Sequence, residues 1–318
     1  MTEKPELMVM TTLRPQAMAR LEDHCTLLRW DEAGDREDFL RCHGPGCRAV
    51  VTSGHVPLTR GMLDAMPDLR LVSCSSAGYD AFDADALAER GIALTNTSRA
   101  LHDDVADTAM MLILAARRAL VPAEAHVRSG AWARDGAFPL QRKVAGTQLG
   151  IVGMGTIGQS IATRAQAFGM QVAYWNRSPR DLPWPQVPDL VQLARDSDHL
   201  VAIVAGGEGT RGLISERVLE ALGPEGLFVN VARGTVVDEA ALIATLTDGR
   251  LGAAALDVYE NEPAPDTRLT GLPNVLNYPH HASGTVETRD AMAGLAADNV
   301  VAFFAGAPLI SPVDLGPR

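Results

Sequence analysis

The sequence predicts an α/β protein built from two doubly wound parallel sheets. Short apolar runs alternate with segments of helical periodicity from the N-terminus onward, which is typical of strands and helices taking turns in a parallel sheet. A G-x-G-x-x-G turn follows one of these runs near the middle of the chain. The length of 318 residues suggests about two domains.

The glycine turn predicts a nucleotide-binding unit. The apolar run 149–152 is followed by Gly153, Gly155 and Gly158, then by a helical repeat that Gly169 ends, and residues 171–175 predict the next strand. In such a unit the first glycine permits a tight turn, the second lets the backbone approach a pyrophosphate, and the third lets helix and strand pack closely. The alternative is a glycine-rich turn with only a structural role.

The residues after strand 171–175 bear on the choice of cofactor. Many NAD-binding units carry an acid here that binds the ribose hydroxyls, but no carboxylate occurs before Asp181. Arg177 can pair with a 2′-phosphate through its planar fork, and Asn176 and Ser178 can add hydrogen bonds. We therefore expect a preference for NADP(H), with NAD(H) possible. The alternative is an exposed arginine, with Asp181 reaching back to bind NAD.

Composition excludes several classes of function. The net charge of −11 disfavours binding to nucleic acid or to an anionic membrane surface. No apolar run reaches roughly 18 residues, and the N-terminus lacks a signal-peptide pattern, so we expect a cytoplasmic protein without a membrane span. The four cysteines have no C-x-x-C spacing; a metal site at Cys42, His43 and Cys47 is conceivable, but reduced thiols and no metal are the better interpretation.

The pattern of apolar residues divides the chain into two α/β regions. In the first region we expect strands at 7–10, 49–52, 69–74 and 92–96 and helices at 15–23, 58–66 and 84–90. A long helix at 103–120, with Asp103 and Asp104 favourable at its N-terminus, precedes a looser segment after Pro122. Further strands are expected at 199–204, 227–231, 252–256 and 274–276, and a proline-rich loop at 181–188. A last helix, 285–304, is expected to pack on the first region, so the chain would cross twice between domains, with a ligand cleft between them.

Three strand ends of the second region carry residues suited to catalysis. Arg233 follows strand 227–231 and can hold a carboxylate with two hydrogen bonds. Glu262 lies in the acidic loop after strand 252–256, and His280 follows Pro279 after strand 274–276. Taken singly, Arg233 would more often form a surface ion pair, Glu262 would more often be a solvated loop acid, and His280 would more often be an ordinary loop histidine. Together, beside a nucleotide fold, they indicate an anion clamp with an acid–base pair.

These motifs, in this order, resemble the D-isomer-specific 2-hydroxyacid dehydrogenase family, in the branch of the glyoxylate/hydroxypyruvate and hydroxyphenylpyruvate reductases. The resemblance covers nearly the whole chain. The segments that carry it are Ser76-Ala77-Gly78-Tyr79-Asp80, Asp104-Val105-Ala106-Asp107, residues 150–158, Val231-Ala232-Arg233-Gly234, residues 256–263 and Pro279-His280.

The resemblance implies a flavodoxin-like substrate domain from residues 1–100 and 284–318, a Rossmann NAD(P)-binding domain at 101–283, and a homodimer built on the cofactor domains. It implies Arg233, Glu262 and His280 as catalytic residues. Substrate contacts are expected from Ser53, Ala77, Gly78, Arg233 and His280, with the Ala77–Gly78 backbone cupping the carboxylate and Asp257 contacting the nicotinamide carboxamide. The expected cofactor contacts are Gly153, Gly155, Thr156, Ile157, Gly158, Asn176, Arg177, Ser178, Val204, Thr210, Val231, Asp257 and Thr108.

The sequence departs from the family pattern at two positions. His281 stands where relatives commonly carry an apolar residue, so either histidine could act; we favour His280 because it directly follows Pro279. Ala77 stands where many relatives have valine, which leaves the shape of the substrate pocket open.

The expected function is the NADPH-preferring reduction of a small 2-keto acid to a D-2-hydroxy acid by hydride transfer. An alternative of another class is a non-catalytic nucleotide-sensing protein, such as the corepressors that share this fold. A second enzymatic alternative is oxidation of formate or phosphite, to which no residue points. The complete set of arginine, glutamate and histidine favours the reductase.

Overall fold

The computed structural model describes residues 4–315. The chain divides into two compact units, of which the first comprises Met1–Leu101 with Ser283–Arg318 and the second His102–Ala282. Each unit contains one sheet, and every strand pairing in both sheets is parallel. This confirms the predicted fold class of two parallel α/β domains.

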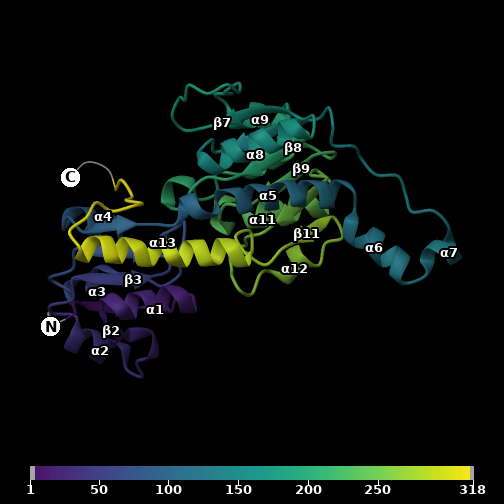
Figure 1. The fold of residues 1–318 in the computed structure, drawn as a ribbon. Helices are drawn as coiled ribbons and strands as arrows, with labels where there is room; N and C mark the ends of the chain where they lie inside the picture. Colours follow the sequence, from purple (N-terminus) through teal and green to yellow (C-terminus); the bar gives the residue numbers. More distant parts are fainter. Residues whose placement is uncertain (1–3, 316–318) are drawn as a thin grey trace. The chain divides into compact units, whose positions relative to one another are not determined.

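The first unit has a five-stranded sheet in the order β2-β1-β3-β4-β5 (Figure 1). The order reverses between β1 and β3, as in flavodoxin-like doubly wound sheets. β3 and β4 are buried at every position, as expected where helices cover both faces of a parallel sheet. The strands are β1 (Glu6–Val9), β2 (Thr26–Arg29), β3 (Ala49–Thr52), β4 (Leu71–Cys74) and β5 (Ala93–Thr95).

The C-terminal helix α13 (Val286–Phe304) belongs to this first unit and packs against α1, β3 and β4 (Figure 1). Its buried face includes three alanines, Ala293, Ala296 and Ala297, which share one core cluster with Leu7 and Leu71. Because alanine side chains are short, the helix axis can approach the strands closely. The other helices of the unit are α1 (Pro15–His24), the 3₁₀ turn η1 (Trp30–Glu32), α2 (Arg36–His43), α3 (Arg60–Asp64) and α4 (Ala84–Glu89).

Two elements of this unit were not predicted from the sequence. β2 is an edge strand of four residues, none of them fully buried, so it lacks a strong apolar run. α2 buries only Leu40 and begins at an N-cap, Asp35, whose side chain accepts a hydrogen bond from the Asp38 N–H. β2 is too short and α2 is both short and polar, which is why hydrophobic periodicity did not reveal them.

The second unit has a six-stranded sheet in the order β11-β10-β9-β8-β6-β7. The predicted strand, glycine turn, helix and strand are confirmed as β6, α8 and β7, and the order reverses between β6 and β8, beside the glycine turn. The strands are β6 (Gln148–Val152), β7 (Gln171–Trp175), β8 (His199–Ala202), β9 (Leu227–Asn230), β10 (Ala253–Leu256) and β11 (Val275–Asn277).

Helices cover both faces of this second sheet. On one face, Arg164 of α8 contacts Asp103 and Asp107 of α5 at 2.9 and 2.5 Å. On the other, α9, α10 and α11 share a single core cluster with the sheet, and α10 packs against both of its neighbours. The helical segments are α5 (Ser98–Arg117), α6 (Leu120–Arg128), α7 (Ala131–Asp135), α8 (Thr156–Ala167), α9 (Leu190–Arg195), η2 (Glu208–Thr210), α10 (Glu216–Leu222), η3 (Gly234–Val236), α11 (Glu239–Thr247) and α12 (Thr267–Thr270).

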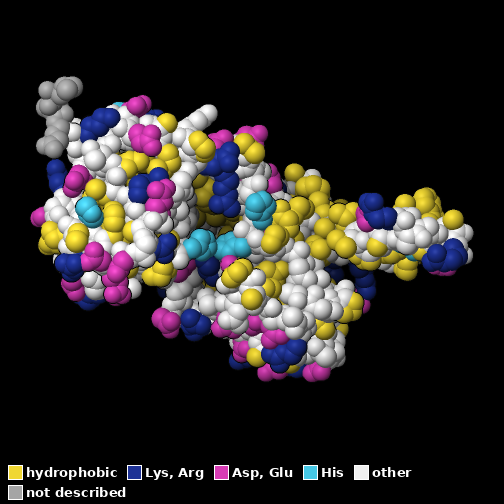
Figure 2. Space-filling view, turned by 90° about the horizontal axis from the view of Figure 1, so that it is seen from below, with side chains coloured by type: hydrophobic (Ala, Val, Ile, Leu, Met, Phe, Trp, Pro, Cys, Tyr) yellow, Lys and Arg dark blue, Asp and Glu magenta, His cyan; other side chains and the backbone are white. Residues whose placement is uncertain are grey.

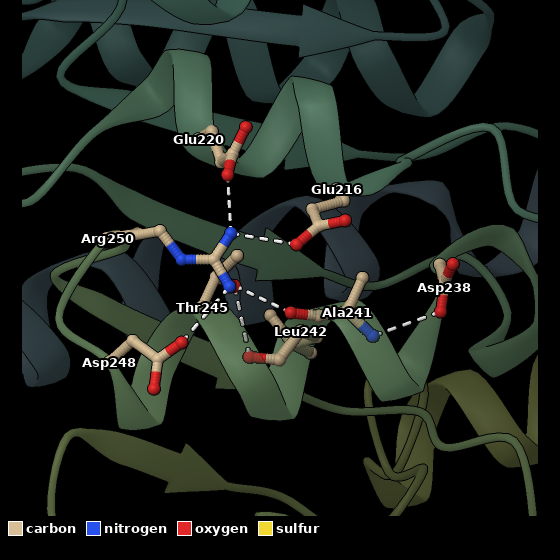
Figure 3. A network of polar contacts seen from close by, with 8 residues as sticks. All are labelled: Glu216, Glu220, Asp238, Ala241, Leu242, Thr245, Asp248 and Arg250. Atoms are coloured by element: carbon tan, nitrogen blue, oxygen red, sulfur yellow. Dashed lines mark hydrogen bonds and ion pairs between the residues drawn. The ribbon is translucent and has the colours of Figure 1, made fainter.

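Arg250 connects α10 to the end of α11 (Figure 3). Its guanidinium forms ion pairs with Glu216 and Glu220 of α10 and with Asp248, which follows α11. At the start of α11 the Asp238 side chain accepts a hydrogen bond from the Ala241 N–H at 3.0 Å (Figure 3). α11 is therefore held at both ends. Because α11 follows the segment that leaves β9 through Arg233, these contacts also hold the end of that segment.

Two details of the sequence-based assignment were wrong. α5 begins at Ser98, so Asp103 and Asp104 lie in its second turn rather than at its N-terminus, and Asp103 instead pairs with Arg164. The segment after Leu120 forms the helices α6 and α7, which project from the rest of the second unit (Figure 1). Pro122 is the third residue of α6, where a missing N–H breaks no helical hydrogen bond.

No helix among residues 4–315 has the length and apolar character needed to cross a bilayer.

A buried histidine, His199 of β8, connects the sheet to the end of α5. Its Nδ1 accepts a hydrogen bond from Arg117 Nε at 3.0 Å, and its Nε2 lies 3.0 Å from Thr147 Oγ1. Since the Thr147 hydroxyl is placed to donate to the Val144 carbonyl at 2.6 Å, the imidazole is neutral and carries its proton on Nε2. Burial, reinforced by the Arg117 charge, lowers the pKa of His199 from 6.5 to about 3.

This buried imidazole should make stability depend on pH. Between about pH 6.5 and 3 the unfolded chain binds a proton at His199 that the folded protein does not, so unfolding becomes more favourable as pH falls. His199 should lower the free energy of unfolding by up to about 1.4 kcal/mol for each pH unit in this range. Denaturant titrations at pH 7, 6 and 5 should therefore give a shallower dependence on pH for His199→Gln than for the wild type. Equal slopes for both proteins would contradict the assignment.

Candidate active site

Three adjacent strands of the second unit place Arg233, Glu262 and His280 along one edge of their sheet. β9, β10 and β11 are neighbours and run parallel, so their carboxyl ends lie at the same edge. Arg233 follows β9, Glu262 lies in the loop after β10, and His280 follows β11.

His280 and Glu262 form a close pair. Nδ1 of His280 lies 2.5 Å from Oε2 of Glu262, and each side chain is 29% exposed, which leaves the pair accessible but partly desolvated. With Glu262 ionised, Nδ1–H is the donor, so a proton exchanged with a bound molecule would pass through Nε2. His280 itself has a left-handed backbone (φ +49°), held by a hydrogen bond of 2.7 Å from its N–H to the Asp257 carbonyl.

The Glu262 carboxylate is positioned by its own loop and by the loop after β9. Its second oxygen accepts the Tyr259 N–H at 2.9 Å. A Cβ on Gly234 would lie 1.9 Å from the Tyr259 carbonyl carbon, so only glycine allows this contact between the two loops. The buried Glu239 accepts the Glu260 N–H at 3.0 Å. Arg233 and Glu262 are therefore carried by loops that fix each other.

Asp257 holds the backbone that follows His280. Its two oxygens accept the N–H groups of His281 and Ala282 at 2.7 and 3.1 Å. Burial raises the pKa of Asp257, which is 1% exposed, while these N–H donors oppose the rise. The carboxylate thus supports the His280 loop, and this role is additional to the cofactor contact expected from the sequence.

Arg233 leaves β9 in an extended conformation and is partly exposed. The fully buried Asn230 fixes this turn, because its side chain accepts the Ala232 N–H and donates to the Arg233 carbonyl, both at 3.0 Å. A guanidinium carried on a turn that is held at both ends suits binding of a carboxylate.

Of the two neighbouring histidines, His280 has the carboxylate partner. His281 is exposed, and its ring lies edge-on to Tyr278 with centroids 6.2 Å apart. The geometry therefore favours His280 as the acid–base residue.

The glycine turn has the shape that a dinucleotide requires. Gly153 has a φ of +105°, and a Cβ on Gly158 would lie 2.2 Å from the Gly153 carbonyl oxygen. A Cβ on Gly155 would meet nothing within 4 Å, so the space in front of the α8 N-terminus is open. Thr156 and Ile157 are the first residues of α8, whose unpaired N–H groups face that space. These residues fit a bound pyrophosphate.

The turn after β7 places the residues expected at the adenosine end of the cofactor. Arg177 and Ser178 are exposed, and Arg177 Nη1 lies 3.5 Å from the position of a Cβ on Gly209. Asn176 accepts the Met154 N–H of the glycine turn at 3.4 Å. Asp181, the acid of the NAD alternative, is exposed on the same loop.

The remaining expected cofactor contacts also lie in the second unit. Val204 packs beside Gly153, and Val231 is buried at the end of β9. Thr210 closes its loop by donating to the Ala205 carbonyl at 2.7 Å. Thr108 of α5 is buried and donates to the Ala282 carbonyl at 3.2 Å, so it also supports the loop that follows His280.

The first unit contains the other expected substrate residues, Ser53, Ala77 and Gly78, on two touching loops. A Cβ on Gly54, next to Ser53, would lie 1.8 Å from the Gly78 carbonyl oxygen, and the Gly54 N–H donates to Ser76 Oγ at 3.1 Å. Within residues 4–315, the N–H groups of Ala77 and Gly78 donate to no other residue. Free amide groups of this kind can receive an anion.

Several positioning residues were not found from the sequence. Asn96 donates to the Ala77 carbonyl at 2.9 Å, and Ser311 Oγ, which donates to the Asn96 carbonyl at 2.6 Å, is in turn bound by Asn299. Asn230 and Glu239 support the Arg233 and Glu262 loops. A polar residue directly at a strand end marks Asn96 and Asn230, whereas Ser311 and Asn299 are distant in sequence and give no signal.

In the described part of the chain, no group of three or more His, Cys, Asp or Glu residues could hold a metal ion.

The fold and this edge of the sheet define an α/β dehydrogenase with a dinucleotide-binding turn. The model of the D-isomer specific 2-hydroxyacid dehydrogenase NAD-binding domain matches residues 110–282. The chain is 42% identical over 294 residues to glyoxylate/hydroxypyruvate reductase A of Arabidopsis thaliana, covering 92% of this chain and 94% of that protein.

Similar solved structures also come from 2-hydroxyacid dehydrogenases and related reductases. A 2-hydroxyacid dehydrogenase from Ketogulonicigenium vulgare superposes with a TM-score of 0.92 at 45% identity, over 98% of this chain and 99% of that one. An NADPH-dependent glyoxylate/hydroxypyruvate reductase from Sinorhizobium meliloti, in complex with NADP and malonate, gives a TM-score of 0.90 at 39% identity, over 99% and 98% of the chains. The chain therefore belongs to the D-isomer-specific 2-hydroxyacid dehydrogenase family, and the matches favour an oxidoreductase over a corepressor-like nucleotide sensor.

Two glycine substitutions should distinguish an effect on cofactor binding from an effect on folding stability. Gly155→Ala adds a methyl group to open space, so we expect an unchanged melting temperature but NADPH binding weakened by about tenfold or more, because the methyl group occupies the cradle. Gly158→Ala must displace the Gly153 carbonyl and should lower stability by about 1–3 kcal/mol. Thermal unfolding and fluorescence titration with NADPH measure the two effects. Normal NADPH affinity in Gly155→Ala would contradict the location of the cradle.

Proposed function

We propose that this protein is an NADPH-preferring reductase of small 2-keto acids of the glyoxylate/hydroxypyruvate type, forming D-2-hydroxy acids. The observation that carries the proposal is the His280–Glu262 pair at 2.5 Å, on the same sheet edge as Arg233 and in the same unit as the glycine turn. Relatives with these names support the substrate class, and the NADP-bound relative supports the cofactor.

In the proposed reaction the residues of the two units have separate tasks. Residues 101–283 bind the cofactor, and residues 1–100 with 284–318 contribute to substrate binding. The free N–H groups of Ala77 and Gly78, with Ser53 beside them, donate to the substrate carboxylate, which the Arg233 guanidinium also binds. The bound nicotinamide supplies the hydride.

His280 is the proposed proton donor. Glu262 accepts the Nδ1–H and so keeps the ring oriented with Nε2–H toward the substrate carbonyl, whose oxygen takes this proton as it becomes a hydroxyl. After this transfer the ring is neutral and takes up a new proton from solvent. Asp257 has two proposed roles. It holds the loop that carries the ring, and it contacts the nicotinamide carboxamide of the cofactor.

The cofactor contacts proposed are the residues expected from the sequence. Gly153, Gly155, Thr156, Ile157 and Gly158 would hold the pyrophosphate at the start of α8. Asn176, Arg177 and Ser178 would bind the 2′-phosphate. The rest of the cofactor would lie against Val204, Thr210, Val231, Asp257 and Thr108.

Initial rates with glyoxylate, hydroxypyruvate and phenylpyruvate, each with NADPH and NADH, test the reaction and the cofactor together. Rapid oxidation of NADPH with one keto acid, and slower oxidation of NADH, is the expected outcome. No turnover with any keto acid, while NADPH binds tightly, would reject the reductase and favour a sensing role.

The acid–base pair predicts two distinct defects. His280→Ala removes the proton donor and should lower kcat by about 10²–10⁴. Glu262→Gln keeps the acceptor for the Tyr259 N–H but removes the ionised partner of the His280 ring, so kcat/KM for reduction should fall. His281→Ala is the matched control and should retain activity. A near-normal kcat in His280→Ala would remove it from this role.

We further propose a homodimer formed through α5–α7. Large apolar side chains are exposed there, including Leu120, Val121 and Val127 at 58–59% and Trp132 at 62%. Figure 2 shows hydrophobic side chains gathered along this projecting arm. A hollow of about 550 Å³ beside it is lined mainly by apolar residues such as Met110, Leu114 and Phe168. Exposed apolar surface next to an apolar hollow favours burial by a second copy.

Charges on the arm should therefore dissociate the protein. Trp132→Glu combined with Val127→Glu is expected to shift sedimentation from dimer to monomer, because burying two carboxylates in an apolar interface is costly. Val286→Glu, at an equally exposed apolar residue in the first unit, is the control and should leave the mass unchanged. A wild-type monomer, or a dimer that tolerates both charges, would refute the interface.

We also propose a cytoplasmic location, supported by the cysteines of the described chain, none of which forms a disulfide: Cys25, Cys42, Cys47 and Cys74.

A further inference from the structure

The proline-rich segment after β7 forms an outer rim on the second sheet. β7 is an edge strand, and residues 185–187 pair with it: the Tyr174 N–H donates to the Pro185 carbonyl at 3.0 Å and the Val187 N–H to the Tyr174 carbonyl at 2.8 Å. The fixed φ of Pro183, Pro185 and Pro188 stiffens the segment. Gln186 is thereby held opposite Tyr174, whose side chain is fully buried.

The Gln186 amide is bound on both sides by the turn that follows β7. Oε1 faces two donors, the Arg180 N–H at 3.1 Å and the Tyr174 hydroxyl at 3.2 Å. Nε2 faces two acceptors, the Asn176 carbonyl at 3.2 Å and the Ser178 carbonyl at 3.5 Å. Because a backbone N–H can only donate and a carbonyl can only accept, the amide has one possible orientation.

The same network takes up the carbonyl groups of the turn. Ser178 O also accepts Asn176 Nδ2 at 2.9 Å, and Arg180 O lies 3.0 Å from the Tyr174 hydroxyl and shares its single proton with Gln186 Oε1. The carbonyls of residues 176, 178 and 180 therefore all point toward the network. The side chains of Arg177 and Ser178 remain exposed on the turn.

An anion site needs donors on its surface and no carbonyl oxygens nearby, because carbonyl dipoles repel negative charge. Gln186 satisfies both conditions for the turn. Its amide donates to the Asn176 and Ser178 carbonyls, so these oxygens face the amide, and it fixes the backbone that carries the Arg177 and Ser178 side chains. A flexible arginine loses more rotational freedom on binding than one on a fixed turn, so a rigid turn favours tight binding of a phosphate.

We propose that Gln186 is a positioning residue for recognition of the cofactor 2′-phosphate, acting through the turn of residues 176–180 and not by direct contact. This inference rests on the proposed NADPH preference. It predicts that Gln186 governs the difference between phosphorylated and unphosphorylated adenosine ligands, and leaves the rest of cofactor binding unaltered.

The test uses 2′,5′-ADP and 5′-AMP, which differ at the 2′-phosphate and require no turnover. Calorimetric titration of wild type, Gln186→Met and Gln186→Glu gives the Kd for each. Methionine keeps the length of the side chain but forms none of the four hydrogen bonds. Glutamate keeps the two acceptor contacts, loses the two donor contacts, and places a negative charge near the phosphate.

For Gln186→Met we expect the Kd for 2′,5′-ADP to rise about tenfold, and that for 5′-AMP to change less than about twofold. Gln186→Glu should weaken 2′,5′-ADP further. In steady-state assays the KM for NADPH should rise while kcat at saturation and the KM for NADH stay constant. Gln192→Met, the same chemical change on α9 in the same unit, is the matched control and should alter neither Kd.

Three outcomes would overturn the inference, and melting temperatures identify any variant that fails to fold. Unchanged Kd values for both ligands in Gln186→Met and Gln186→Glu would reject the role of Gln186 while leaving the NADPH preference intact. Equal weakening of both ligands would assign Gln186 a general structural role. A wild type that binds 5′-AMP as tightly as 2′,5′-ADP would reject the cofactor preference, and the role of Gln186 with it.

Discussion

The geometry of the second unit depends on the close approach of two loop backbones, at Gly234 and Tyr259. A side chain at Gly234 would occupy the position of the Tyr259 carbonyl, so the loops after β9 and β10 can meet only with glycine there. Arg233 precedes this glycine, and Glu262 is held by the N–H of the same Tyr259. One contact thus sets the spacing between Arg233, the proposed anion-binding group, and Glu262. His280, the proposed acid–base residue, is held by Glu262 and by the Asp257 carbonyl.

The fold class could be predicted, and the candidate catalytic residues could be proposed, because both are expressed in short stretches of sequence. A buried parallel strand is an apolar run, and a strand end is the place where a polar residue follows it, so Arg233 and His280 could be recognised as candidates. Their grouping followed from the general property that parallel strands end at one edge. The preference for His280 over His281 depended on Pro279 alone, and the structure adds the physical reason, which is the Glu262 partner.

What the sequence did not reveal depends on side chains that meet across long separations or on elements without a hydrophobic pattern. The connection from Asn299 through Ser311 and Asn96 to the Ala77 loop joins residues more than 200 positions apart. β2 is too short, and α2 is too short and too polar, for periodicity to detect. The sequence predicts a looser segment after Pro122, where the structure has α6 and α7; in the first turn of a helix proline removes no hydrogen bond.

The turn after β7 shows how much of a binding preference lies outside the residues that would touch the ligand. Arg177 and Ser178 can be identified from the sequence because their chemistry suits a phosphate. Whether they bind a phosphate depends on the backbone of the turn. Its carbonyl groups would repel that phosphate unless hydrogen-bond donors bind them. Gln186 and Tyr174 are those donors, and the rigid proline-rich rim is what holds Gln186 in place. Cofactor preference is therefore a property of the turn and the rim together, and an arginine transferred alone into a related turn would lack the support that makes it selective.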